Sequence, residues 1–109
     1  MKIATVIILY RPDPETIAFV ETYASTSTPV VAVWNEFPRF DSEPFAGNEA
    51  ITLLGNPSNI GLASALNIGI ERAFADGADR VLLLDQDSRP RNGMAASLSA
   101  ALDSASADG

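Results

Sequence analysis

The stretch IGLASALNIGIERAFADGADRVLLLDQD, residues 60–87, decides the fold of this chain. Its first half places large apolar residues at i, i+4 spacing, as on one side of an amphipathic helix, and these residues are Leu62, Leu66, Ile70 and Phe74. We expect them to lie in the core. Gly77 follows and can adopt the left-handed conformation in which many helices end. The apolar run 81–84 is typical of a strand buried on both faces, and a helix that leads into such a strand indicates a mainly parallel α/β sheet.

The rest of the chain repeats this alternation of buried strands and helices. Residues 3–10 form an apolar run rich in β-branched side chains, which predicts the first strand. Asp13 and Pro14 predict the start of a helix, because aspartate caps helix N-termini and proline fits the first turn. Further elements are predicted as strands at 30–34 and 50–54, a turn at 55–59, a helix from there to about residue 76, a last helix at about 90–102 and a frayed tail at 103–109. We expect a single domain, residues 1–109, built in three layers.

The composition excludes several classes of partner and site. The chain has 109 residues and a net charge of −7, from 7 basic and 14 acidic residues. This balance argues against a nucleic-acid partner, because phosphate backbones are bound by clustered Lys and Arg. The sequence has no Cys and no His, which excludes thiolate and histidine metal ligands and leaves oxygen ligands, suited to Mg²⁺, Mn²⁺ or Ca²⁺. The apolar N-terminal run is too short to span a membrane, so we expect a cytoplasmic domain.

Three polar segments follow predicted strands, at the edge where α/β sheets bind their ligands, and they are 10–12, 34–36 and 85–87. If the fourth strand continues to residue 87, the side chains of Asp85 and Asp87 point to the same side. Two carboxylates that close repel each other, and a divalent cation would relieve the repulsion and bridge a diphosphate. The alternative is that both residues are solvated parts of a turn, because Asp is common at strand ends and Asp-x-Asp alone is a weak signal.

The segment that opens the second predicted helix also has features of a ligand-binding surface. Gly61, Ala63 and Ala65 are small enough for a ligand or another backbone to approach closely. Asn59 and Asn67 disfavour a helix unless they cap it or bind something. The alternative is that Asn59 caps the helix and Asn67 satisfies a nearby loop.

Taken together, these segments resemble the N-terminal half of a family 2 glycosyltransferase, and most of all its bacterial rhamnosyltransferase branch. The matching stretches are ATVIILYRP at 4–12, VVAVWN at 30–35 and NPSNIGLASALNIGIERAFADGADRVLLLDQDS at 56–88. The resemblance covers residues 3 to about 95. It implies a Rossmann-like GT-A fold with sheet order 3-2-1-4 and a nucleotide-diphospho-sugar donor, with dTDP-rhamnose as the expected one.

The resemblance also implies roles for individual residues. A Mg²⁺ or Mn²⁺ ion would be held at Asp87 with the help of Asp85. The residues that would contact the donor are Tyr10, Arg11, Asn35, Asn59, Gly61, Ala63 and Asp85. The acceptor would be a saccharide or a lipid-linked saccharide in cell-surface polysaccharide synthesis, and the full-length enzyme would associate peripherally with the inner face of the membrane. The catalytic base would lie beyond residue 109, so this chain would bind the donor without turnover on its own.

One position departs from the family pattern. Many relatives carry Asp-Asn at the end of the second strand, where the Asp accepts a hydrogen bond from the nucleobase, but this chain has Trp34 and Asn35. Trp34 either stacks on the base or packs in the core, and Asn35 would replace the Asp as acceptor.

Two other functions stay open at this point. A strand that ends in Asp-x-Asp also resembles the first motif of haloacid-dehalogenase-like phosphatases, in which the first Asp is the nucleophile. Here the motif continues with Ser88 and Arg89 rather than Gly-Thr or Gly-Val, which favours the glycosyltransferase. The other alternative is a non-catalytic remnant that forms a homodimer through its open sheet edge and exposed apolar surface.

Overall fold

The computed structural model of the chain describes residues 2–38, 44–45 and 47–87. The elements along the chain are β1 (Ile3–Tyr10), α1 (Pro14–Thr26), β2 (Val30–Asn35), β3 (Ile51–Asn56), α2 (Leu62–Ala75) and β4 (Arg80–Leu84). Strands and helices therefore follow one another in the predicted order. The helix predicted at about 90–102 and the tail at 103–109 lie outside the described residues.

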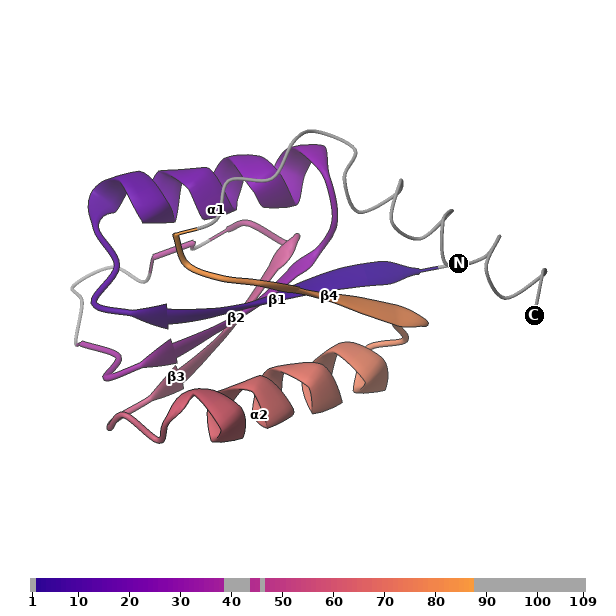
Figure 1. Ribbon diagram of the computed structural model, residues 1–109. Helices are drawn as coiled ribbons and strands as arrows, with labels where there is room; N and C mark the ends of the chain where they lie inside the picture. The colour runs from indigo at the N-terminus through magenta and orange to yellow at the C-terminus, as the bar shows by residue number, and fades with distance from the viewer. Residues whose placement is uncertain (1, 39–43, 46, 88–109) are drawn as a thin grey trace.

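All four strands run parallel in one sheet of order β3-β2-β1-β4 (Figure 1). The α/β class and the sheet order 3-2-1-4 are thereby confirmed. β1 pairs with β2 as far as Tyr10, which lies opposite Asn35. On its other side, β1 pairs with β4 only as far as Ile7, which lies opposite Leu84. The last part of β1 thus has a strand partner on one side only.

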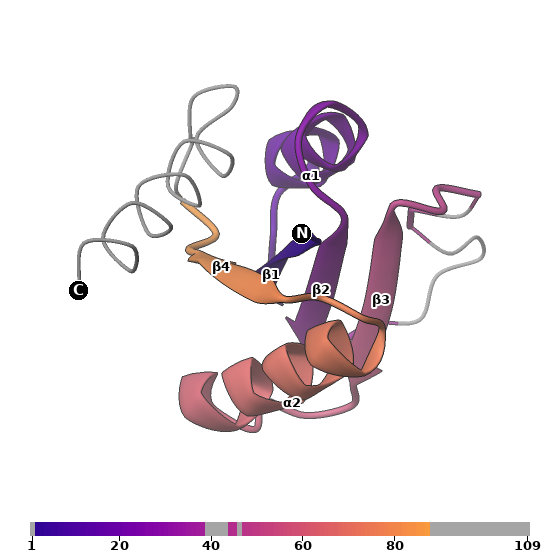
Figure 2. The ribbon, with the colours of Figure 1, turned by 90° about the vertical axis from the view of Figure 1, so that its right-hand side faces the viewer.

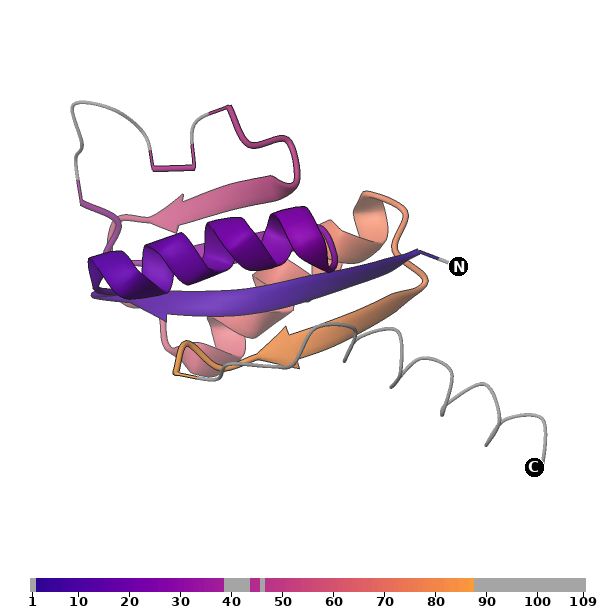
Figure 3. The same cartoon turned by 90° about the horizontal axis from the view of Figure 1, so that it is seen from above.

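The two helices cover opposite faces of the sheet, which gives three layers (Figure 2). Seen from above, α1 runs along β1 (Figure 3). On the α1 face, the largest fully buried side chains are Ile7, Leu9 and Val20. On the α2 face, the buried residues are Ala4, Val6, Val31, Val33, Ala65, Ala73 and Ala78. Neither helix in the described ranges has the length and apolar character needed to cross a membrane.

The start of α1 follows the sequence prediction. The Asp13 carboxylate accepts a hydrogen bond from the backbone N–H of Thr16 at 2.8 Å, and Pro14 is the first residue of the helix. This bond satisfies one of the amides that every helix leaves without a partner in its first turn. Local chemistry therefore fixes where α1 begins.

α2 packs on the sheet through small residues, and this corrects the sequence prediction. Its buried residues are Ala65, Gly69 and Ala73. The large stripe expected in the core is not buried at its ends, since Leu62 is 61% exposed and Phe74 is 50% exposed. A β-carbon added to Gly69 would lie 2.5 Å from Cγ1 of Val6 on β1. The prediction was wrong because the small side chains let helix and sheet approach closely, and that close packing excludes the larger side chains from the interface.

The predicted turn at 55–59 begins too early, because β3 continues through Gly55 and Asn56. The ring of Phe37 explains the glycine, since a β-carbon on Gly55 would lie 2.8 Å from Cγ of Phe37. The end of α2 agrees with the prediction. Gly77 has a φ angle of 101°, and its N–H donates a hydrogen bond to the carbonyl of Phe74 at 3.0 Å, as expected of a left-handed residue that ends a helix.

Candidate functional site

A cavity of about 660 Å³ opens at the carboxyl end of the sheet, between the ends of β1 and β4 and the start of α2. Its lining residues are Ile8, Tyr10, Asn35, Asn59, Leu62, Leu66, Leu83, Leu84, Asp85, Gln86 and Asp87. The structure thus brings together residues from all three polar segments expected at this edge, with Asn59 added from the loop before α2. Arg11, Gly61 and Ala63, which the resemblance also implies, are not among the lining residues.

The two aspartates reach this cavity by a route that the sequence does not predict. β4 ends at Leu84, so the strand does not continue to residue 87 and strand alternation cannot explain where the carboxylates lie. The chain instead turns at Gln86 and Asp87. Asp85 and Asp87 are both exposed and both line the cavity. Both residues are therefore accessible to a solute at this cavity.

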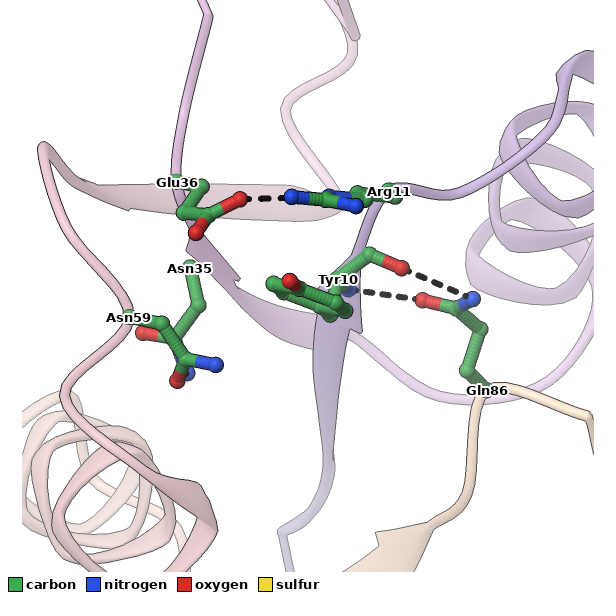
Figure 4. A network of polar contacts seen from close by, with 6 residues as sticks. All are labelled: Tyr10, Arg11, Asn35, Glu36, Asn59 and Gln86. Carbon is green, nitrogen blue, oxygen red and sulfur yellow. Dashed lines mark hydrogen bonds and ion pairs between the residues drawn. The ribbon is translucent and has the colours of Figure 1, made fainter.

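The turn between the aspartates is tied to the end of β1 by one side chain. The backbone N–H of Tyr10 donates to Oε1 of Gln86 at 2.8 Å, and Nε2 of Gln86 donates to the carbonyl of Tyr10 at 3.2 Å (Figure 4). This pair of bonds lies where β1 has no strand partner on the β4 side. Gln86 appears in the sequence pattern only as the spacer between the two acids, so sequence reasoning gave it no role.

Three asparagines link β2, β3 and the loop before α2. Nδ2 of Asn56 donates to Oδ1 of Asn35 at 3.0 Å, and Nδ2 of Asn35 donates to Oδ1 of Asn59 at 3.3 Å. Asn59 also accepts the backbone N–H of Gly61 at 2.9 Å. Asn35 is only 3% exposed, and within the described ranges no buried side-chain nitrogen or oxygen lacks a partner. These bonds shape the cavity wall nearest α2.

The structure also decides two alternatives that the sequence left open, one for Asn59 and one for Trp34. Asn59 does not cap α2 itself, because the cap residue is Gly61 and it carries no side-chain cap. Asn56 was placed in a turn by its sequence context, so its contact with Asn35 was missed. Trp34 packs in the core, where it is 3% exposed and its ring meets that of Phe37 edge-on at a centroid distance of 5.3 Å. Trp34 is thus unavailable for stacking on a ligand.

Arg11 and Glu36 stand at the ends of β1 and β2 and contact each other across the sheet edge (Figure 4). Nε of Arg11 lies 3.2 Å from Oε2 of Glu36, and the Arg11 guanidinium carbon lies 5.0 Å from the centroid of the Tyr10 ring. Both residues have left-handed backbones, with φ angles of 46° and 57°. Such angles disfavour residues other than glycine and are common near functional sites. The Arg11 side chain is 73% exposed, so the ion pair itself adds little stability.

The cavity has an acidic side and an apolar side. The apolar side is formed by Leu62 and Leu66 of α2 and by Leu83 of β4. Leu83 is 50% exposed because it lies on the edge strand of the sheet, on the face that α2 covers only in part. The homodimer expected through exposed apolar surface stays a prediction.

The chemistry of the donor groups fits a hard divalent cation. Asp85 and Asp87 are exposed carboxylate residues, and both line a cavity large enough for a ligand. Within the described residues, no group of three or more acidic, His or Cys side chains converges on one point. Two carboxylates suffice for Mg²⁺, which keeps several waters and takes further oxygens from substrate phosphates.

Comparison with known proteins finds a curated relative. The chain is 32% identical over 107 residues to the dTDP-rhamnosyl transferase RfbF of Shigella flexneri. The similarity takes in 97% of this chain and 36% of the length of that relative, so the chain spans about a third of it. No protein-family model matches the chain, and no solved structure matches it. The similarity over nearly the whole chain supports a relationship with the glycosyltransferases.

Proposed function

We propose that this chain forms the donor-binding part of a glycosyltransferase and holds a nucleotide-diphospho-sugar with a Mg²⁺ or Mn²⁺ ion at Asp85 and Asp87. The observation that carries the proposal is the position of these two carboxylates. Both are exposed, and both line one cavity at the carboxyl end of a parallel sheet of order 3-2-1-4, where α/β folds of this kind bind ligands. The relationship to a glycosyltransferase supports a donor of this class.

The polar residues of the cavity and Tyr10 have distinct parts in this proposal. The cation would supply positive charge to a diphosphate and stabilise it as a leaving group. Tyr10 is 39% exposed and borders the cavity, so its ring can pack against a nucleoside or sugar. Asn35 and Asn59 are bonded to each other and line the cavity with side-chain amide groups.

dTDP-rhamnose is the donor that we propose, because the relative is described as a dTDP-rhamnosyl transferase. Asn35 would accept a hydrogen bond from the base only with the second lone pair of Oδ1, because Asn56 already donates to that oxygen. A saccharide or lipid-linked acceptor, a role in polysaccharide synthesis and a position at the inner face of the membrane remain parts of the proposal for the whole enzyme.

Titration calorimetry of the full 109-residue chain with dTDP and with UDP, each with and without Mn²⁺, tests the proposal. We expect binding that requires Mn²⁺ and is lost in Asp85→Asn and Asp87→Asn. Glu71→Gln is the matched control, since it removes one negative charge from an exposed position on α2. Binding that survives both asparagine variants, or that is equal with and without Mn²⁺, would refute the metal site.

A further inference from the structure

We propose that Gln86 is a positioning residue whose carboxamide takes the place of the backbone C=O and N–H that a longer β4 would present to Tyr10, and thereby holds Asp85 and Asp87 at the cavity. The metal-binding role of the two acids belongs to the proposed function, and the expected effect of Gln86 on ligand affinity rests on that function. Two hydrogen bonds, which we call the anchor, join Gln86 to the backbone of Tyr10. The Tyr10 N–H donates to Oε1 at 2.8 Å, and Nε2 donates to the Tyr10 carbonyl at 3.2 Å.

The register of the sheet explains why such a replacement is needed. The last β1–β4 pair is Ile7 with Leu84, whereas β1 continues beyond that pair up to Tyr10. The N–H and C=O of one strand residue point toward the same neighbouring strand. Both groups of Tyr10 are bonded by Gln86, so they point toward the place that a longer β4 would occupy.

A carboxamide is the side-chain group that can bond the N–H and the C=O of Tyr10 at the same time. It offers an acceptor oxygen and a donor nitrogen on one planar group, whereas a longer parallel β4 would supply the C=O and the N–H from two successive peptide groups. Glutamate would offer two acceptors and no donor when ionised, and leucine would offer neither. The backbone of residues 85–87 is then free to turn away from the sheet while the end of β1 keeps both bonds.

The consequence concerns the two acids on either side of Gln86. A continued strand would hold residues 85–87 in line with the sheet, with the peptide groups committed to β1. The observed turn instead brings both aspartates to the cavity, and Gln86 ties this turn to the sheet through its side chain. Gln86 also connects two parts of the cavity lining, because Tyr10 lines the cavity from β1 and residues 85–87 line it from the segment after β4.

A role in positioning differs from a role in stability alone. Tyr10 is 39% exposed and Gln86 is only partly buried, so water can replace much of what the bonds contribute to folding. Loss of the carboxamide should therefore leave the fold intact but let the turn move. Residues that orient metal ligands typically change metal affinity by about 10–100-fold when they are replaced.

The test compares Gln86→Leu and Gln86→Glu with the unchanged chain. Ala18→Glu, at an exposed position of α1, controls for the added charge of the glutamate variant. Hydrogen exchange of the Tyr10 amide reports the anchor, and calorimetry with dTDP and Mn²⁺ reports affinity. We expect faster exchange at Tyr10 in Gln86→Leu, which lacks the acceptor of the Tyr10 N–H, and unchanged exchange at Ala32 in the middle of β2. We expect an affinity lowered about tenfold in both Gln86 variants, since Gln86→Glu loses the bond to the Tyr10 carbonyl.

The glutamate variant separates positioning from electrostatics. A third carboxylate between Asp85 and Asp87 would by charge alone strengthen cation binding, whereas loss of the anchor weakens it. Tighter binding by Gln86→Glu, or unchanged binding by Gln86→Leu, would overturn the inference. If the unchanged chain binds no dTDP with Mn²⁺, the proposed function fails. Hydrogen exchange of the Tyr10 amide would then decide the inference, since exchange unaffected by Gln86→Leu would overturn it.

Discussion

Gly69 of α2 lies against Val6 of β1, so close that a β-carbon added to Gly69 would come within 2.5 Å of Cγ1 of Val6. Val33 of β2 stands on the other side, 3.1 Å from the same position. The contact brings the backbone of α2 directly onto the two central strands. This close contact sets the distance between α2 and the sheet. It therefore also sets where the first residues of α2 lie at the candidate site.

Gly69→Ala should therefore destabilise the protein, by about 1–3 kcal/mol, because the added methyl group overpacks the core. Helix propensity alone predicts the opposite, since alanine is favoured over glycine inside a helix by about 1 kcal/mol. Chemical denaturation measures the difference in unfolding free energy. The pair Glu71→Ala and Glu71→Gly, at an exposed position of α2, measures the propensity contribution where packing imposes no constraint. A more stable Gly69→Ala would show that α2 is not held so close to the sheet.

The exposed stripe of α2 gives a second prediction. Leu62→Ala should cost less than about 1 kcal/mol, as for most surface positions, because Leu62 is 61% exposed. Leu9→Ala is the matched control at a residue with no exposure, and it should cost about 2–5 kcal/mol. Urea denaturation of both variants checks this. Equal losses in the two variants would mean that the large stripe is buried after all.

The cap of α1 gives a third prediction. Asp13→Ala should lower the unfolding free energy by about 1 kcal/mol, because the Thr16 amide loses its acceptor. Asp13→Ser retains a capping oxygen and should remain close to the unchanged chain. Thermal unfolding followed by circular dichroism distinguishes the two, and an alanine variant as stable as the serine variant would speak against the cap.

The asparagine network gives a fourth prediction. Asn35→Ala removes a buried donor and a buried acceptor, and so deprives Asn56 and Asn59 of their partner. We expect a loss of about 1–3 kcal/mol in unfolding free energy. Asn67→Ala is the control, because Asn67 is exposed on α2 and alanine is the better helix former there. A neutral Asn35→Ala would indicate that water replaces both bonds.

A fifth prediction concerns the two aspartates without and with a cation. In the absence of divalent ions, Asp85→Asn and Asp87→Asn should be at least as stable as the unchanged chain, because each removes a repulsion between like charges. With Mn²⁺ and dTDP at about 100 times the dissociation constant, the unchanged chain should gain about 2.7 kcal/mol, and the variants should gain nothing. Differential scanning calorimetry measures both effects. Equal gains in all three proteins would place the ligand elsewhere.

Part of this fold could be predicted because the signals are local. The apolar run of β1, the capping oxygen of Asp13 and the left-handed Gly77 each act within a few residues, and the structure confirms all three. The sheet order was expected from the family resemblance rather than from local patterns, and it is confirmed as well.

The face of α2 that packs on the sheet could not be predicted in the same way. Both Leu62–Leu66–Ile70–Phe74 and Ala65–Gly69–Ala73 repeat at i, i+4, so periodicity alone does not say which stripe is buried. Hydrophobicity favours the larger stripe, but the choice depends on how closely the helix can approach Val6 and Val33. That distance is a property of two elements together.

By itself, the sequence determined the alternation of strands and helices, the starts and ends that depend on caps and glycines, and the presence of polar residues after strands. Only the tertiary structure decided that Asp85 and Asp87 share a cavity with Tyr10 and that Gln86 binds the backbone of Tyr10. The physical reason is the length of β4, which ends at Leu84 while β1 continues. The Gln86 side chain bonds the part of β1 that extends beyond the last β1–β4 pair, and this difference in strand length arises only when the strands pair.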